Sequence, residues 1–66
     1  MAAPLAELSS LATALEELRQ RVAGIADRSA AEHDEETASE LFAVERALIG
    51  AGRRLGRIAA SPRRRR

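Results

Sequence analysis

The spacing of large apolar residues in the second half of the chain is the strongest constraint on its fold. Between residues 40 and 58 they recur at alternating steps of three and four, with Ala51 filling one gap. These residues are Leu41, Val44, Leu48, Leu55 and Ile58. On an α-helix this spacing gathers them on one face. Phe42 and Ile49 widen the face to roughly 200°, about twice the stripe of an ordinary surface helix, so more than one neighbouring helix is expected.

The first half of the chain repeats the pattern. Its apolar residues are Leu5, Leu8, Leu11, Leu15, Leu18, Val22 and Ile25. They fit a heptad repeat with Leu8, Leu15 and Val22 at the a positions. Leu11, Leu18 and Ile25 then take the d positions, so both sets are expected to face the partner helix. Because Pro4 suits a first helical turn, the sequence predicts a helix from about residue 4 to about residue 28.

A break in the apolar pattern predicts a turn over about residues 29–34. Ser29 and Glu32 match the capping box that opens a helix, and Asp34 is a second candidate cap. The second helix is expected over about residues 35–60, because Ser61-Pro62 disfavours its continuation. Residues 61–66 are predicted to be a disordered, arginine-rich tail.

Length and composition favour an all-α fold. The chain has 66 residues, no cysteine and one aromatic residue, Phe42, while Ala, Leu, Glu and Arg dominate. Acidic residues open each predicted helix and arginines close it, which complements the helix dipoles. An antiparallel, coiled-coil-like hairpin over residues 1–60 also places the basic end of the first helix beside the acidic start of the second. The sequence therefore predicts a two-helix hairpin rather than one long helix.

A hairpin of this size leaves part of its apolar surface uncovered. Two helices touch along one line, so the flank formed by Phe42 and Ile49 would stay half exposed. Pairing of two hairpins into a four-helix bundle would cover that flank. The expected protein interface consists of Leu41, Phe42, Leu48, Ile49, Gly52 and Leu55. Gly52 and Gly56 are four residues apart, a spacing that allows close approach of another helix.

Catalytic and metal-binding patterns are weak. No serine lies in a nucleophile elbow, and the one histidine, His33, falls at the predicted turn. His33, Glu36 and Glu40 could share a helix face and hold a metal, but a solvated turn and helix start is the preferred explanation. We therefore expect no catalytic residues, no metal and no cofactor, and a protein that is not an enzyme.

The charge is strongly polarised along the chain. Residues 29–45 carry six acids and no arginine, whereas residues 46–66 carry eight arginines and no acid, within a net charge of +1. The candidate anion-binding residues are Arg53, Arg54, Arg57, Arg63, Arg64, Arg65 and Arg66. They could contact nucleic-acid phosphates. The lack of stacking aromatics and the acidic middle of the chain argue against this use.

Two functional hypotheses follow. The first is a small non-enzymatic protein-interaction or accessory regulatory module, whose partner is a second copy of the chain or another helical protein. The alternative is a nucleic-acid-associated protein that uses the arginine cluster and tail. The sequence shows no secretory signal and no apolar run of the ~20 residues that a membrane span needs. A cytoplasmic location is expected.

Overall fold

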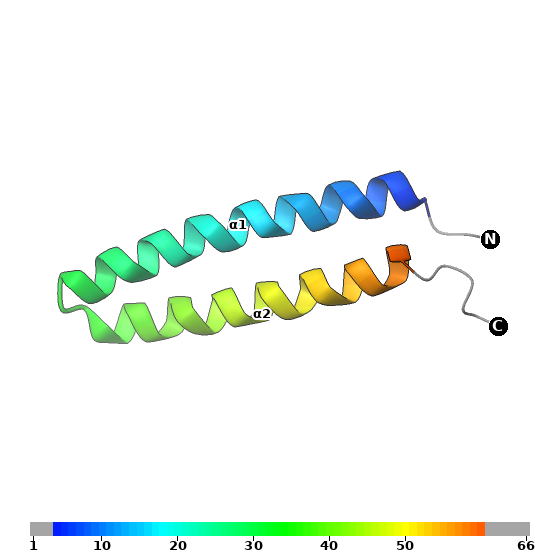
Figure 1. The fold of residues 1–66 in the computed structure, drawn as a ribbon. Helices are drawn as coiled ribbons and strands as arrows, with labels where there is room; N and C mark the ends of the chain where they lie inside the picture. The colour runs from blue at the N-terminus through cyan, green and yellow to red at the C-terminus, as the bar shows by residue number, and fades with distance from the viewer. Residues whose placement is uncertain (1–3, 61–66) are drawn as a thin grey trace.

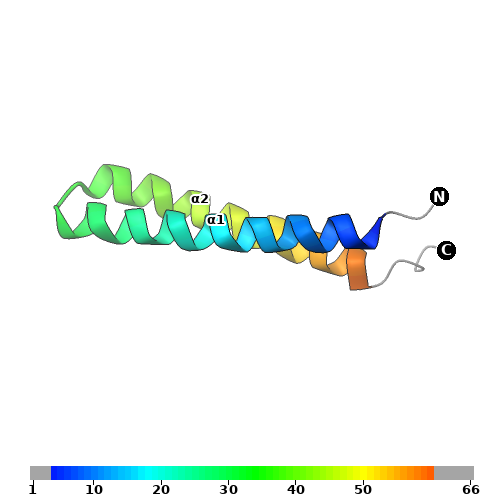
Figure 2. The same ribbon diagram turned by 90° about the horizontal axis from the view of Figure 1, so that it is seen from above.

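The structure is a computed structural model that describes residues 4–60 as two antiparallel helices lying side by side (Figure 1). α1 spans Leu5–Ala31 and α2 spans Glu35–Ala60. No strand occurs within residues 4–60. Seen from above, the helices cross at a shallow angle (Figure 2). The prediction of an all-helical fold with two packed helices is confirmed. The predicted tail, residues 61–66, lies outside the described residues.

The first helix is longer than the sequence predicts. α1 continues to Ala31 instead of ending near Arg28. Residues 29–31 are Ser-Ala-Ala, and alanine has the highest helix propensity, so the helix persists after its apolar pattern has stopped. Ser29 therefore lies inside α1, and the predicted capping box of Ser29 and Glu32 does not form. The connection between the helices is only residues 32–34.

The turn closes the end of α1 with backbone hydrogen bonds. The His33 N–H donates to the Ala30 carbonyl at 3.0 Å, and the Asp34 N–H donates to the Ser29 carbonyl at 2.9 Å. This pair of bonds is the Schellman arrangement, which requires one residue in the left-handed conformation. That residue is His33, with φ 64°. A side chain with a Cβ is disfavoured there, so the position usually belongs to glycine.

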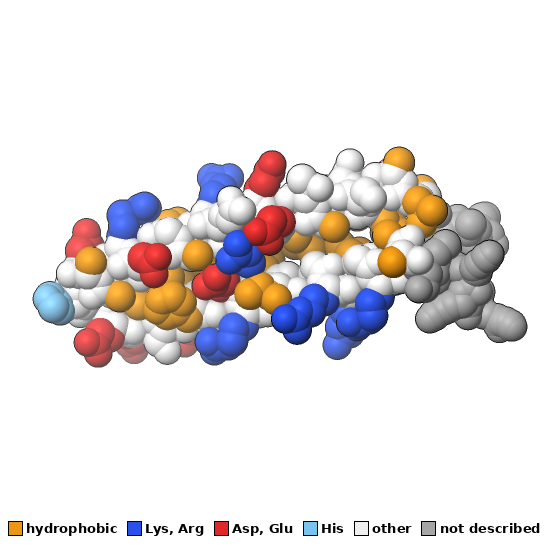
Figure 3. Space-filling view, in the orientation of Figure 1, with side chains coloured by type: hydrophobic (Ala, Val, Ile, Leu, Met, Phe, Trp, Pro, Cys, Tyr) orange, Lys and Arg blue, Asp and Glu red, His pale blue; other side chains and the backbone are white. Residues whose placement is uncertain are grey.

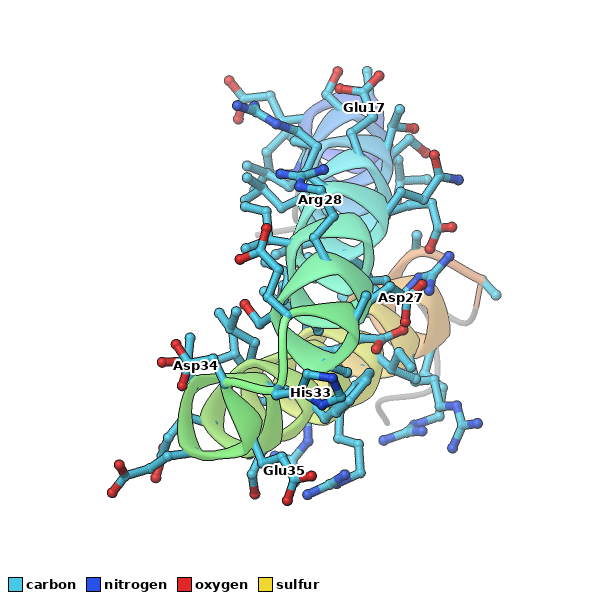
Figure 4. All side chains as sticks on the ribbon, turned by 90° about the vertical axis from the view of Figure 1, so that its left-hand side faces the viewer. Glu17, Asp27, Arg28, His33, Asp34 and Glu35 are labelled. Atoms are coloured by element: carbon cyan, nitrogen blue, oxygen red, sulfur yellow. The ribbon has the colours of Figure 1, made fainter. Side chains whose placement is uncertain are left out.

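The same short connection also opens α2. The Asp34 carboxylate accepts a hydrogen bond from the Thr37 N–H at 3.3 Å, so Asp34 caps α2. Glu35 and Glu36 follow in the first turn, where negative charge complements the helix dipole. Figure 4 shows that the side chains of His33, Asp34 and Glu35 point in different directions from the turn. Three residues thus end one helix and begin the next.

The helices meet along a narrow line, which we call the seam. Its two buried residues are Ala26, which is 0% exposed, and Ala38, which is 4% exposed. The remaining seam residues are half-buried: Leu8, Ala12, Leu15, Arg19 and Val22 on α1, and Leu41, Glu45, Leu48, Gly52 and Leu55 on α2. Within residues 4–60 no large side chain is fully buried. The hairpin therefore has a line of contact rather than an enclosed core.

The predicted d positions of α1 do not face α2. Leu11, Leu18 and Ile25 are 53%, 45% and 44% exposed, so the prediction is wrong for these residues. The residues of α1 that face α2 are the a positions and the residues four places after each a position. Ala12 and Ala26 stand in that second row, and their small side chains let α2 approach there. The contact line on α1 therefore includes the row four residues after each a position instead of the row of d positions.

Substitution of His33 tests the turn. His33→Gly should raise the free energy of unfolding by about 1 kcal/mol, because glycine adopts the left-handed conformation without a Cβ clash. His33→Val should lower it, since a β-branched side chain is poorly tolerated there. His33→Asn is the matched control and should stay close to the original stability. Urea melts followed by circular dichroism measure all three, and equal stability of the Gly and Val variants would contradict the role assigned to His33.

Candidate interaction surface

The hairpin has two sides, one on each flank of the seam. One side bears an open groove of about 280 Å³ between the helices. The groove is lined by Ala12, Leu15, Glu16, Leu48, Ile49, Gly52 and Arg53. Glu16 on α1 and Ile49 and Arg53 on α2 therefore belong to the same flank. We call this flank the charged side, and we call the opposite flank the apolar side.

An ion cluster joins the helices on the charged side. The Arg19 guanidinium donates from Nε to Glu16 Oε1 at 3.0 Å and from Nη2 to Glu16 Oε2 at 2.7 Å. Its Nη1 donates to Glu45 Oε2 on α2 at 2.9 Å. Gln20 Nε2 adds a hydrogen bond to Glu16 Oε2 at 3.1 Å. In the space-filling view, acidic and basic side chains meet across the two helices near the middle of the hairpin (Figure 3).

The cluster shifts the ionisation of its members. The hydrogen bonds from Arg19, and then from Gln20, lower the pKa of Glu16 to about 2. The hydrogen bond to Glu16 raises the pKa of Arg19 above its already high ordinary range. Glu16 and Arg19 therefore stay ionised at neutral pH, and all three charged groups already have partners. The cluster therefore fixes the two helices together and leaves no free acid or base for chemistry.

The ion pairing differs from the expected pattern. The sequence places the basic end of the first helix beside the acidic start of the second. Among the described residues, the one ion pair between the helices is Arg19–Glu45, which lies in the middle. Arg21 and Arg28 make no ion pair with another described residue. Figure 4 shows Arg28 on the outer surface of α1.

The predicted interface residues divide between the seam and the charged side. Leu41, Leu48 and Leu55 are half-buried against α1. Phe42 lines a second open groove, of about 400 Å³, with Ala30, Glu35, Ala38, Ser39 and Arg46. Ile49 lines the first groove. Phe42 and Ile49 are half-buried, so the hairpin already covers part of both side chains.

Gly52 lies on the floor of the first groove. A Cβ built at this position meets no atom within 4 Å, so α1 does not approach it closely. Gly56 is equally open. Contact of another helix with these glycines stays a prediction, because α1 does not supply that contact.

Six large apolar side chains within residues 4–60 are exposed, and all except Leu5, at the start of α1, lie on the apolar side. On α1 these are Leu11, Leu18 and Ile25, and on α2 they are Val44, 44% exposed, and Ile58, 48% exposed. Both rows repeat every seven residues, with Ala51 at the middle position on α2. A seven-residue repeat keeps a row on one side along paired helices. The heptad pattern of the sequence predicts the repeat on α1 but places Leu11, Leu18 and Ile25 in the contact with α2.

The arginines near the end of α2 are exposed. Arg53, Arg54 and Arg57 make no ion pair with another described residue. Arg63, Arg64, Arg65 and Arg66 lie outside the described residues. The three described arginines are thus open to an acidic partner.

No metal-binding group forms at the turn. Within residues 4–60, no three His, Asp or Glu side chains come together in a way that could hold a metal ion. His33, the residue considered for such a group, instead supplies the left-handed conformation that ends α1.

Comparison with known proteins finds no matching family, no matching curated protein and no matching solved structure. Neither helix within residues 4–60 is long and apolar enough to cross a membrane.

The lowered pKa of Glu16 predicts a loss of stability in acid. The contribution of this carboxylate is fully present above pH 4.5, the ordinary pKa, and is lost as the pH falls toward 2. Glu16→Gln should therefore be less stable than the original chain at pH 7, and the difference should shrink between pH 4.5 and pH 2. Thermal melts across this range measure it.

Glu17→Gln is the matched control, because it removes the same charge from the neighbouring exposed position without breaking a recorded contact. An equal loss of stability in both variants at pH 7 would mean that net charge, and not the Arg19 cluster, determines the effect.

Proposed function

We propose that this chain is a helical protein-interaction module that binds other helices through its apolar side. The observation that carries the proposal is the pair of exposed apolar rows, each repeating every seven residues, on one flank of the hairpin. Large apolar residues scattered singly over a surface are ordinary. Two such rows on the same flank of neighbouring helices together form a strip, which is the kind of surface that marks an interaction site.

The strip suits a helical partner. Amphipathic helices bind by placing residues with three-four spacing into a matching apolar strip. Covering Leu11, Leu18 and Ile25 at once requires contact along most of α1, and covering Val44 and Ile58 requires the same of α2. A partner with two helices satisfies both requirements. A four-helix bundle of two hairpins is therefore the assembly that we propose.

The role that we propose is non-enzymatic. The ion cluster of Arg19, Glu16 and Glu45 is internally paired, and the groove beside it that Glu16 lines contains no serine, threonine or histidine. An accessory or regulatory protein of the cytoplasm, acting by binding, fits these features.

Removal of the apolar row on α1 tests the proposal. The double variant Leu11→Gln/Leu18→Gln should be monomeric at concentrations where the original chain is dimeric. Both side chains are about half exposed in the hairpin, so their loss should weaken association more than folding. Glutamine keeps a helix propensity similar to that of leucine. Sedimentation equilibrium gives the mass, and circular dichroism gives the helix content.

Thr13→Gln is the matched control, because Thr13 is exposed and lies on the outer surface of α1 away from both rows. It should leave the mass unchanged. Identical masses for the double variant and the original chain would contradict the proposed function.

The exposed arginines support a second candidate, binding to nucleic acid. Arg53, Arg54 and Arg57 lie within two turns of α2 and are unpaired among the described residues. A phosphate backbone could accept their charge together with that of the arginines in residues 61–66.

Salt titration tests this candidate. With four to seven arginine–phosphate contacts, the logarithm of the binding constant for duplex DNA should fall with the logarithm of salt concentration with a slope of about −4 to −6. Arg53→Gln/Arg57→Gln should reduce the slope by about two, since each contact contributes about 0.9. Absence of binding by the full chain at low salt would remove this candidate.

A further inference from the structure

We propose that a second copy of this chain covers the apolar side, with its turn placed beside the open end of the first copy. In this arrangement α1 lies on the partner's α1 and α2 on the partner's α2, both antiparallel. The inference rests on the proposed function and adds the orientation of the second copy.

Charged residues border both exposed rows on the side away from the seam. On α1, Arg21 lies three residues after Leu18, and Arg28 lies three residues after Ile25. Glu7 lies four residues before Leu11, so this border is acidic at the open end and basic near the turn. All three side chains are exposed, and none has an ion-pair partner among the described residues.

The border on α2 has the opposite order. Glu40 lies four residues before Val44, and Arg54 lies four residues before Ile58. This border is therefore acidic near the turn and basic at the open end. Both side chains are exposed and lack an ion-pair partner among the described residues.

Each charged border is complementary in charge to the same border of a second copy that runs in the opposite direction. An antiparallel α2 pair places Glu40 of each copy near Arg54 of the other. An antiparallel α1 pair that overlaps along its full length places Glu7 of each copy near Arg28 of the other. A second copy of the chain thus supplies an apolar strip of the same spacing and opposite charges along both of its edges. Complementary charge borders of this kind select a partner and fix its orientation.

The lengths of the helices agree with this pairing. α2 spans Glu35–Ala60, so Glu40 is five residues after its start and Arg54 is six residues before its end. The two residues are almost equidistant from the middle of the helix. Two hairpins that overlap along their full length therefore bring Glu40 and Arg54 to the same level, twice in each dimer.

A second face-to-face arrangement would place the two turns together. It lays α1 on the partner's α2 and matches the border charges as well, because Glu40 would then lie near Arg21 and Arg28. It also brings together two clusters of acids, since Glu32, Asp34, Glu35 and Glu36 all lie at the turn. The reversed arrangement separates these clusters and places each beside the basic end of an α2 helix. Repulsion between like charges therefore favours the turn-to-open-end dimer.

Charge reversal at Glu40 and Arg54 distinguishes the two arrangements. In the turn-to-open-end dimer, Glu40→Arg alone gives two arginine–arginine contacts, and Arg54→Glu alone gives two glutamate–glutamate contacts. Each variant should dimerise roughly tenfold more weakly than the original chain. An equimolar mixture should recover full affinity, because every new arginine then meets a new glutamate. Native mass spectrometry identifies the mixed dimer by its mass, and sedimentation equilibrium measures its affinity.

In the arrangement with both turns together, neither residue faces the other, so the mixture would stay as weak as its components. That result, or single variants that dimerise like the original chain, would overturn the proposal. Circular dichroism of each variant confirms that the hairpin is folded, and 1 M salt should restore dimerisation of the single variants by screening the repulsion. If Leu11→Gln/Leu18→Gln abolishes the dimer but the mixture fails to recover it, the proposed function stands and only the orientation is wrong.

Discussion

Two helices can contact each other along only one line, and the position of that line around each helix determines what the rest of this protein can do. The line is set by small residues, because Ala26 and Ala38 are the only described side chains that the hairpin buries. α2 approaches α1 where these alanines stand. Larger side chains one row away are left on the surface. The exposed apolar rows are thus a direct consequence of how the hairpin closes.

The polar residues reinforce this choice of contact line. Arg19 occupies the same row as Ala12 and Ala26, and from there its guanidinium reaches both Glu16 on its own helix and Glu45 on α2. The turn adds a second constraint, because Asp34 both completes the end of α1 and caps α2. With three connecting residues, the helices have little freedom to rotate relative to each other. The apolar rows are therefore held on a common side.

The sequence predicts the helices well because their signals are local. Three-four spacing, Pro4 directly before α1 and Asp34 as a cap act within a few residues of where they stand. The contact line depends on both helices together. The leucines at the d positions of α1 suggest the wrong line, because their spacing fits a helix contact as well as that of the residues that form it. The apolar pattern places the end of α1 too early, because the helix propensity of Ser29–Ala31 continues the helix after that pattern has stopped. Nothing local marks Glu45 as the partner of Arg19, which lies twenty-six residues away.

The distribution of the two buried alanines also bears on how the hairpin opens. Ala26 and Ala38 lie close to the turn, whereas the open groove beside Leu15 and Leu48 lies toward the other end. Burial of side chains is therefore greatest beside the turn, although the larger of the two open grooves, lined by Ala30, Ala38 and Phe42, also lies there. The two helices should therefore separate first at their free ends, while the end beside the turn stays closed. A partner that binds the free ends would then reduce the motion of the part of the molecule that opens most easily.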